Sequence, residues 1–453
     1  STQAASDAVE GAEAWLHKNA GGLTAPAITV ALGKRYGNDK TFAGPILMFA
    51  AACGRFGAGR DAWVDVHQLP FELAAAPPSV WRLLRLSVVS YGLPALIAVG
   101  LARHRNRPTH NPITRFLRDL CAARVLRVCE SMQPSNGGFE EAPPLTGFVA
   151  VGLTVAGYRD HAVVRSGIDF LVNGQREDGS WPIDTDLATW VTTLSINALD
   201  EHPNGIDRLP VDQRQSILKW ILNQQHRERH PLTYTDPGGW AWTDLEGAMP
   251  DADDTPGVMM AIRRLAENPA EHRDRIESAA DWLMSIQNWD GGIPTFNKGW
   301  GKLPFDRSCP DLTSHVLRAF CEWRDDFSPA MAEKTKQSAG RMLEYLVTSQ
   351  QADGSWSPLW FGNQYTGAAQ TNRIYGTAQT VIALKAVESA GYADVAEPLA
   401  HACGWLKTIQ RKDGAWGGDD IGTPASIEET ALATRALTAG GDMAAAERGI
   451  AWL

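Results

Sequence analysis

The chain has 453 residues, of which 44% are hydrophobic and 21% are charged, a composition that is typical of globular proteins and excludes long disordered stretches. Lys and Arg number 42 against 52 Asp and Glu, which gives a formal net charge of −10. Because the chain also lacks a basic block, nucleic acid is not an expected partner. Tryptophan is unusually frequent, with 17 Trp against 13 Phe and 8 Tyr, and indicates a repeated structural or pocket role.

The six cysteines form neither a C-x-x-C pair nor a framework of regular spacings, which predicts free thiols in a reducing, cytoplasmic compartment. The N-terminal residues lack the basic and apolar regions of a signal peptide. Residues 86–102 carry no charge and lie between arginines, but the run is shorter than the about 18 residues of a spanning helix. This run predicts either a buried pair of core helices or a monotopic membrane patch with basic rims for anionic lipid.

One pattern recurs along the chain: a helix-like apolar segment, then Gln, three residues, Gly, one residue and an aromatic. The Asp-Gly and Asn-Gly steps are turn signals, and another helix-like segment follows most of them. The pattern is complete at Gln175, Gln350 and Gln410, has a close variant that ends in Phe at Gln133, and is partial at Gln225 and Gln287.

This repeat predicts an all-α fold built from helix–turn–helix units of roughly 40 to 60 residues. Stacked helix pairs of this kind form either an open solenoid or a closed α/α barrel. Trp405 lies five residues before Gln410, whereas Trp452 is the penultimate residue of the sequence. By that register, we expect the chain to stop within a repeat.

An acidic motif, Asp251-Ala-Asp253-Asp254-Thr255-Pro256, follows a Gly-Gly-Trp turn. Pro256 is favourable at the first position of a helix, and Asp254 or Thr255 could cap that helix. The motif predicts a surface capping cluster, a Ca²⁺ site or a general acid, although the spacing of an EF-hand is absent. Crowded carboxylates cannot all ionise, so one of them would stay protonated. In a dry, tryptophan-lined cavity such an acid could protonate an alkene, and aromatic faces would steady the resulting cation.

The repeats and the acidic motif together resemble class II terpene cyclases, the squalene-hopene cyclase superfamily. The resemblance is clear from about residue 125 to 450, and PGGWAWTDLEGAMPDADDTPGVMMAI matches the segment of that family that carries the acid. It implies two α/α barrels, one carrying the acid and one smaller. On this basis we expect residues 1–20 and 176–453 to form the catalytic barrel, and residues 21–175 a reduced second helical domain.

The resemblance also assigns catalytic residues. It implies that Asp253 donates the proton and that Asp251 and Asp254 flank and tune it. His315, in PDLTSHVLRAF, matches the histidine that hydrogen-bonds the acid and strengthens it. Tyr375, in RIYGTAQ, matches a tyrosine of the network that returns the proton.

Three aromatic residues, Trp190, Trp242 and Phe296, match family positions that line the substrate cavity. One tryptophan position of the family is not filled here, and Trp360 or Tyr365 is expected to compensate. The chain is much shorter than a full squalene-hopene cyclase and lacks the family's aromatic C-terminal tail. The substrate length, the number of rings and the oligomeric state therefore stay open.

The expected function is that of an isomerase that cyclises a linear polyprene such as squalene without a cofactor. The segment PFELAAAPP and the 86–102 run resemble the membrane-facing part of squalene cyclases, so we expect peripheral contact with the inner face of the membrane. The alternative is a cyclase of a prenyl diphosphate, such as geranylgeranyl diphosphate, with Mg²⁺ and a basic clamp. Candidates for that clamp are Lys298, Lys302, Arg307, Arg227 and Arg229.

Other classes fit the sequence less well. A class I terpene synthase needs a D-D-x-x-D motif, which is absent. A protein prenyltransferase β-subunit needs a zinc set with D-x-C spacing, and Asp306 and Cys309 miss that spacing. An α/α-barrel glycosidase needs paired carboxylates across a polar groove. A non-catalytic repeat scaffold would have no need to retain Asp253, His315 and Tyr375 together.

Overall fold

The structure, a computed structural model, describes residues 2–36, 43–83, 92–230, 235–246, 248–298, 306–359, 361–362, 371–418 and 423–453. The chain divides into two compact units, each with cores of its own. The first unit contains the described residues up to Asp186 and a short return at residues 245, 246 and 248. The second unit contains the other described residues from Leu187 onwards.

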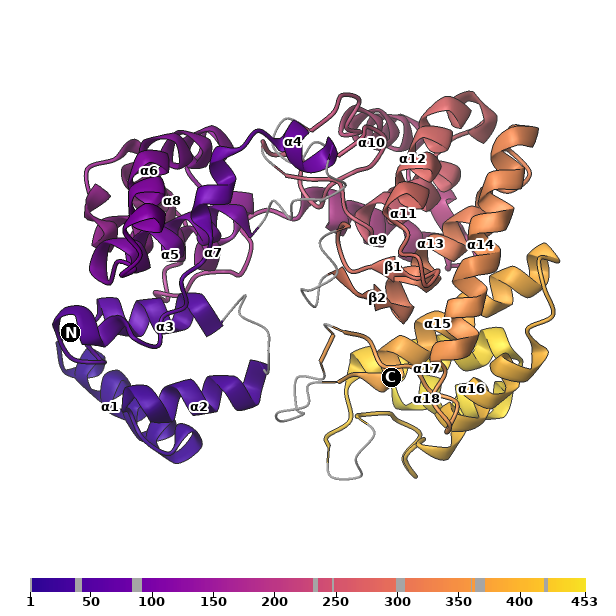
Figure 1. The fold of residues 1–453 in the computed structure, drawn as a ribbon. Helices are drawn as coiled ribbons and strands as arrows, with labels where there is room; N and C mark the ends of the chain where they lie inside the picture. Colours follow the sequence, from indigo (N-terminus) through magenta and orange to yellow (C-terminus); the bar gives the residue numbers. More distant parts are fainter. Residues whose placement is uncertain are drawn as a thin grey trace. The chain divides into compact units, whose positions relative to one another are not determined.

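The first unit is a cluster of helices in which α5 packs against α3, α6 and α7, and α8 packs against α7 (Figure 1). Its α-helices are α1 (Thr2–Ala20), α2 (Ala25–Tyr36), α3 (Ala43–Ala52), α4 (Pro78–Leu83), α5 (Leu93–Asn106), α6 (Pro112–Met132), α7 (Pro143–Leu153) and α8 (Ala162–Asn173). Its short helical turns are η1 (Gly59–Trp63), η2 (Phe71–Ala75), η3 (Phe139–Glu141) and η4 (Thr154–Tyr158).

Helix α5 forms part of the core of the first unit. Ile97, Val99 and Leu101 are fully buried, and Gly100 leaves room for the Leu69 carbonyl and the side chain of Phe71. The described end of the 86–102 run therefore packs inside the unit, as the core-helix alternative predicts. Residues 84–91 lie outside the described part of the chain, and membrane contact stays a prediction. Among the described residues, no helix is long and apolar enough to cross a membrane.

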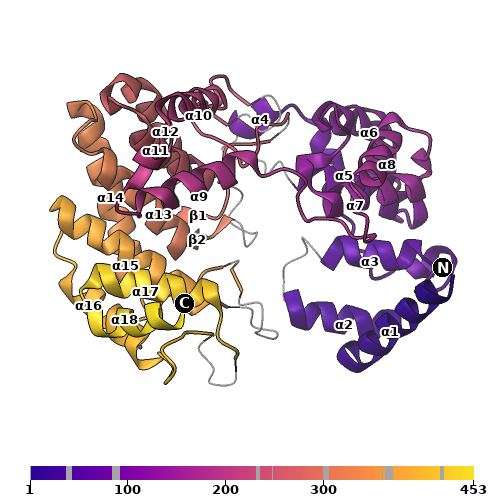
Figure 2. The ribbon, with the colours of Figure 1, turned by 180° about the vertical axis from the view of Figure 1, so that it is seen from behind.

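The second unit is an α/α barrel with an inner and an outer row of helices. Each inner helix packs against the next, and the outer helices lie between them on the outside (Figures 1 and 2). The inner helices are α9 (Ala188–Asp200), α11 (Asp254–Leu265), α13 (Pro310–Trp323), α15 (Arg373–Ala390) and α17 (Ile427–Gly440). The outer helices are α10 (Val211–Asn223), α12 (Arg273–Ile286), α14 (Pro329–Ser349), α16 (Ala396–Thr408) and α18 (Met443–Trp452). The short elements are η5 (Gly205–Arg208), η6 (Pro269–His272), β1 (Ile293–Pro294) and β2 (Ser308–Cys309).

Ion pairs join the two ends of the inner row. Arg435 of α17 bonds to Glu201 at the end of α9, which links the last inner helix to the first. Arg264 of α11 pairs with Asp200 at 2.9 Å and with Glu322 of α13 at 2.8 Å. The all-α fold and the α/α barrel that the repeats predicted are thus confirmed.

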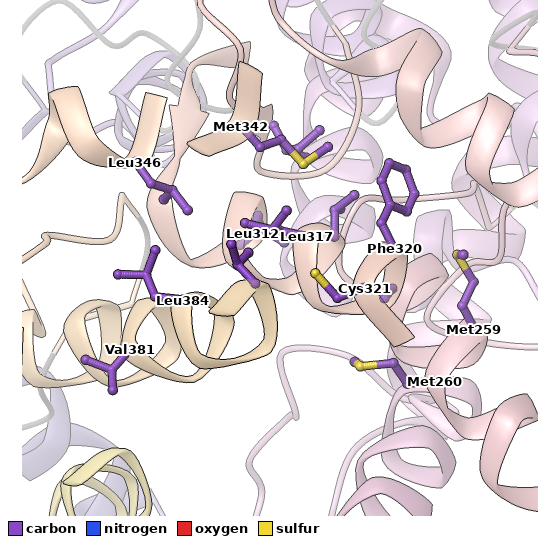
Figure 3. Packing of buried hydrophobic residues seen from close by; sticks show 14 of the residues in the cluster. Met259, Met260, Leu312, Leu317, Phe320, Cys321, Met342, Leu346, Val381 and Leu384 are labelled. Carbon is purple, nitrogen blue, oxygen red and sulfur yellow. The ribbon is translucent and has the colours of Figure 1, made fainter. Parts of the chain in front are cut away.

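One continuous core fills the space between the two rows of the barrel. Figure 3 shows part of it, where Leu312 and Phe320 of α13 face side chains of the neighbouring helices such as Met342 and Leu384. Five tryptophans of this unit are almost completely buried, namely Trp240, Trp282, Trp323, Trp356 and Trp416. Much of the tryptophan excess therefore serves packing, as the repeat predicted.

The glutamine of each repeat ties one outer helix to the next. Gln350, at the end of α14, donates through Nε2 to the Gly354 carbonyl and to the Pro398 carbonyl in α16, both at 3.0 Å. The glycine is needed because its φ is +96° and a Cβ there would lie 2.6 Å from the His401 carbonyl oxygen. The same double hydrogen bond is made by Gln133, Gln225, Gln287 and Gln410.

The last residue of each repeat is held by a threonine of the following inner helix. The backbone N–H of Trp356 donates to Thr377 Oγ1 at 2.9 Å, while its indole N–H donates to the Leu346 carbonyl at 2.8 Å. The repeat at Gln175 differs. Its glutamine bonds to the Gly179 carbonyl but, within the described ranges, to no second helix, and Trp181 is 45% exposed. This repeat lies at the end of the first unit.

The predicted domain boundary at residues 175 and 176 is close to the division at Asp186. Helix α1 packs against α2, and both belong to the first unit. The assignment of residues 1–20 to the catalytic barrel stays a prediction. All six cysteines are free thiols.

Candidate active site

The acidic motif lies at the N-terminal end of α11, and its first carboxylate caps that helix. Asp251 Oδ1 accepts the backbone N–H groups of Asp253 and Asp254, each at 2.8 Å. The expected caps, Asp254 and Thr255, have other positions: Asp254 begins the helix, and the Thr255 hydroxyl bonds to the backbone of Trp240. Asp251 therefore fixes the backbone that carries the middle aspartate.

Asp253 is the carboxylate of the motif that is open to a partner. Its side chain is 30% exposed, whereas Asp251 and Asp254 are buried. Its Oδ2 accepts the indole N–H of Trp190 on α9 at 3.3 Å. The backbone N–H of Trp190 in turn donates to the Trp242 carbonyl at 3.1 Å, so two of the predicted cavity aromatics are fixed beside the acid.

Burial governs the electrostatics of the three carboxyl groups. Burial raises the pKa of Asp253 to about 6, and the Trp190 hydrogen bond opposes this shift. Burial and the charges of Asp251 and Asp253 hold the pKa of Asp254 well above its ordinary range. Burial also raises the pKa of Asp251, against the hydrogen bonds that its carboxylate accepts. Each of the three carboxyl groups is therefore easier to protonate than an ordinary aspartate.

His315, on α13, faces the acid but forms no direct hydrogen bond with its carboxylate. Nε2 of His315 lies 3.9 Å from Oδ1 of Asp253, which is longer than a hydrogen bond. Burial and the positive charge of Arg318 lower the pKa of His315 to about 3, so the ring is neutral. The ring packs on the backbone of α11 at Gly257, where a Cβ would lie 3.4 Å from Nε2.

Tyr375 lies in the first turn of α15, where the Asn372 side chain accepts its backbone N–H at 2.9 Å. Its ring stacks at an angle of 30° on that of Phe361, with the centroids 4.6 Å apart. Burial and the nearby carboxyl groups of Asp311 and Asp253 hold the pKa of the phenol well above its usual range. The structure thus brings Tyr375 to the same end of the barrel as the acid and adds a second aromatic ring.

Phe296 is joined to the acidic motif through the backbone. Its carbonyl accepts the N–H of Ala252 at 2.8 Å. The residues before it form β1, which pairs antiparallel with β2, and Ile293 lies opposite Cys309 in that pairing. Because β2 leads directly into α13, this small sheet fixes the Phe296 segment against the helix that carries His315. The other predicted cavity residues, Trp360 and Tyr365, lie outside the described part of the chain.

One buried pair at this site was not predicted from the sequence. The Cys309 thiol donates to Asp311 Oδ1 at 2.5 Å and accepts the N–H of Leu359 at 3.3 Å. Burial raises the pKa of Asp311 to about 6, and the charge of Asp253 contributes to this shift. Asp311 lies in the first turn of α13, four residues before His315, and this spacing on one helical face was the signal that could have found it.

The predicted diphosphate clamp has weak support among the described residues. Lys298 donates to the Gln287 carbonyl at 2.9 Å, and Arg229 pairs with Asp236 at 2.6 Å. Arg227 and Arg307 are exposed, and Lys302 lies outside the described residues. Within the described ranges, no three His, Cys, Asp or Glu side chains gather as a ligand set for a metal ion.

Comparison with known proteins agrees with this geometry. Residues 187–453, the greater part of the chain, match the family model of the squalene-hopene cyclase C-terminal domain. The chain belongs to the squalene-hopene cyclase family. The matched region begins at the same residue as the barrel unit.

Individual relatives of this chain are distant and longer. A squalene–hopene cyclase of Bradyrhizobium diazoefficiens is 28% identical over 330 residues, 65% of this chain and 46% of that protein. A terpene cyclase–glycosyl transferase fusion protein of Humicola fuscoatra is 28% identical over 309 residues, 61% of this chain and 22% of that protein. The chain thus spans less than half the length of these two curated relatives. The ent-copalyl diphosphate synthase from Streptomyces platensis shares the fold, with a TM-score of 0.50 at 18% identity over 94% of this chain and 84% of that one.

Proposed function

We propose that this chain is a class II terpene cyclase that converts a linear polyprene such as squalene into a polycyclic terpene. The observation that carries the proposal is the state of Asp253. Its carboxyl group is the accessible one of three, its raised pKa keeps part of it protonated near neutral pH, and Trp190 lies against it. Membership of the squalene-hopene cyclase family supports the reaction class.

In the proposed first step, the Asp253 carboxyl transfers its proton to a terminal alkene or epoxide. For an alkene, the π electrons form the new C–H bond, the O–H bond breaks, and a tertiary carbocation and the Asp253 carboxylate remain. The carboxylate that forms accepts the Trp190 N–H, which stabilises the new charge. Asp251 keeps the acid in place through the two backbone N–H groups that it binds.

The carbocation then passes along the chain as each further alkene attacks it and closes a ring. The faces of Trp190, Trp242, Phe296 and Tyr375 supply the π electrons that steady such cations. Loss of a proton or capture of water ends the sequence, so the reaction is an isomerisation or a hydration. Exclusion of water from the site prevents early capture of the cation.

The alternative substrate is a prenyl diphosphate, because the same acid could protonate its terminal alkene. This chain shares its fold with an ent-copalyl diphosphate synthase over 94% of its length, which supports this alternative. Against it stand the protein partners of Lys298 and Arg229, two of the residues expected to bind the diphosphate.

The test is a product assay by mass spectrometry. Purified protein in mild detergent is offered squalene or geranylgeranyl diphosphate in separate reactions, the second with Mg²⁺. We expect the wild-type protein to form a cyclic triterpene from squalene. The Asp253→Asn variant should form this product about 10²–10⁴-fold more slowly, because a general acid contributes a rate enhancement of that size. An exposed carboxylate on α12, Asp281, supplies the matched control Asp281→Asn, which should react as the wild type does.

Each outcome of the assay decides one part of the proposal. A cyclic diphosphate from the second reaction would replace squalene with the alternative substrate and leave the acid mechanism intact. A normal product yield from Asp253→Asn would overturn the assignment of the proton donor. Melting curves of wild type and variant, recorded on the same samples, show that any loss of product is not a loss of fold.

A further inference from the structure

Helix α13 has one narrow polar face. Asp311, His315, Arg318 and Glu322 stand at positions i, i+4, i+7 and i+11, and at 100° per residue they fall within an arc of about 60°. The apolar residues of α13 that Figure 3 labels lie outside this arc. Charged groups of α9, α11 and α17 act on Arg318, so the polar face points into the barrel. Its first half adjoins the acid, and its second half continues away from it.

The second half of this face holds a buried charge without a partner. Arg318 is 9% exposed, and among the described residues its guanidinium forms neither a hydrogen bond nor an ion pair. Burial, and next to it the charge of Arg435, lower the pKa of Arg318 to about 10, which leaves it charged at neutral pH. Arginine is almost never buried to this extent unless it is paired, so this guanidinium requires a compensating group.

The carboxylates that act on Arg318 are held by other arginines. Glu322, four residues later on the same helix, accepts two hydrogen bonds from Arg264, at 2.8 and 3.2 Å. Glu201, at the end of α9, is bound by Arg435. The side chains of Glu322 and Glu201 are 24% and 54% exposed, so water also weakens their field. Neither carboxylate therefore compensates Arg318 at contact distance.

Two further arginines make the space around Arg318 electropositive. Arg435 of α17 and Arg264 of α11 both act on it from neighbouring inner helices. The pKa of His315 is lowered by burial, by Arg318 and, to a smaller extent, by the same two arginines. Guanidinium groups that converge in this way attract an anion and repel a metal cation. The small exposed fraction of Arg318 restricts the anion to a small one.

We propose that Arg318, with Arg264 and Arg435 around it, forms a binding site inside the barrel for a small monovalent anion of the size of chloride. The guanidinium N–H groups of Arg318 would donate hydrogen bonds to the ion. The ion would lie one helical turn beyond His315, on the side away from Asp311. The site is separate from the acid, so it stands whether or not the proposed reaction is correct.

Such an ion would act on the neighbouring histidine. Burial and the charge of Arg318 lower the pKa of His315, so an anion that neutralises Arg318 would raise this pKa again. By linkage, protonation of His315 would strengthen the binding of the anion by the same factor. The anion would therefore control how readily the ring that faces Asp253 takes up a proton.

The experiment is a chloride titration of the full chain at constant ionic strength, with gluconate as the replacing anion. Broadening of the chloride NMR signal reports bound ion, and the midpoint of urea unfolding reports the stabilisation that binding provides. We expect saturable broadening and a higher urea midpoint in chloride than in gluconate. The pKa of His315, followed by NMR, should rise by about one unit at saturation.

Variants of two arginines on α13 test the assignment. Arg318→Met should abolish the saturable broadening and the difference between the two salts. Arg318→Lys keeps the charge but loses the planar group of donors, so it should bind chloride about tenfold more weakly. The matched control is Arg324→Met, since Arg324 lies on the same helix, is 33% exposed and pairs with Asp325. This control should bind chloride as the wild type does.

Two results would overturn the proposal. One is that the wild type shows no saturable broadening beyond that of Arg318→Met, which would mean that water or protein dipoles compensate the guanidinium. The other is that inorganic phosphate raises the urea midpoint and chloride does not, which would assign the space to a larger anion. Should Arg318→Met not fold, the wild-type titration and Arg318→Lys still decide. Neither readout uses cyclisation, so a failure of the proposed reaction is distinguishable from a failure of the anion site.

Discussion

Asp253 and His315 face each other across the N-terminal end of α11 with 3.9 Å between Oδ1 and Nε2, a gap that no direct hydrogen bond spans. The ring is neutral because burial and Arg318 lower its pKa to about 3. A neutral histidine does not add a positive charge that would force Asp253 to ionise. The acid therefore keeps a pKa of about 6, set by burial, and remains able to carry the proton that the proposed reaction needs.

The first prediction concerns the pH dependence of cyclisation. The reactive form of Asp253 is the protonated one, and its fraction falls as pH rises through about 6. We expect the initial rate of product formation to decrease about tenfold per pH unit above pH 6 and to level off below it. His315 should not contribute a second change between pH 5 and 8, since its pKa is about 3. A rate that is constant from pH 5 to 8 would contradict the assignment.

A second prediction concerns Arg318, a buried residue one helical turn after His315. Replacing it by methionine removes a positive charge and keeps an unbranched side chain at this position. We expect the pKa of His315 to rise from about 3 by roughly one to two units, as expected for a charge about 6 Å away in a protein environment. Desolvation remains, so the pKa should stay below the usual value of about 6.5.

This shift in the His315 pKa is measurable by NMR titration of the imidazole resonances. The His315 signal is identified as the one that is missing in a His315→Gln variant. Arg324→Met provides the control, because Arg324 follows the same helix in a more exposed place and pairs with Asp325 at 3.2 Å. It should leave the His315 pKa nearly unchanged. Equal shifts in the two arginine variants would show that Arg318 has no specific effect on the ring.

The sequence predicted the framework of the fold because the repeat is a local pattern with a local cause. Gln350, Gly354 and Trp356 lie within seven residues, and each makes a contact that the spacing alone implies. The contacts that escaped prediction depend on segments distant in sequence, such as the bond from Leu359 to the Cys309 thiol. For the same reason the sequence left burial of the 86–102 run as one of two alternatives, since an apolar run does not reveal what covers it.

The candidate site shows the same limit. The acidic motif indicated its carboxylates, but which of them caps α11 depends on backbone geometry, and the cap proved to be Asp251. Family resemblance located His315 and Tyr375, yet it could not supply the distance to Asp253 or the charge of Arg318 beside the ring. His315 is neutral only in the folded barrel, because burial of the ring and the charge of Arg318, one helical turn away, lower its pKa.

A third prediction concerns the thiol that bonds to Asp311. Cys309→Ala removes the donor at 2.5 Å and leaves a buried carboxyl without its side-chain partner. We expect a loss of about 1–3 kcal/mol in the free energy of unfolding, measured by urea denaturation. Cys309→Ser, which keeps a donor, should lose less, and Cys321→Ala is the control for removing a buried thiol elsewhere on α13.

The pH dependence of this loss has a definite sign. The folded pKa of Asp311, about 6, is above its unfolded value, so its contribution is fully present below about pH 4 and is lost as pH rises through 6. The thiol bond lowers that pKa, so its removal raises the pKa further. The destabilisation by Cys309→Ala should therefore be greater at pH 8 than at pH 5, and the reverse order would contradict the role of the thiol as donor to a carboxylate.

The fourth prediction tests why the repeat requires glycine. Gly354 has a φ of +96°, and a Cβ at this position would lie 2.6 Å from the His401 carbonyl oxygen. Gly354→Ala should lower the free energy of unfolding by on the order of 2–4 kcal/mol, because it combines left-handed strain with a backbone clash. Gly391, which follows α15 in the same unit with a φ of +65°, is open to solvent on that side, and a Cβ there would meet no atom within 4 Å.

Gly391→Ala therefore carries the strain of the left-handed conformation without the clash, and it should cost about 1–2 kcal/mol. Urea denaturation of both variants measures the difference, which isolates the close approach of the repeat turn to helix α16. If the two variants lost the same stability, left-handed strain alone would explain the glycine. A larger loss in Gly354→Ala would instead show that the turn must touch the next outer helix, the same helix that Gln350 binds.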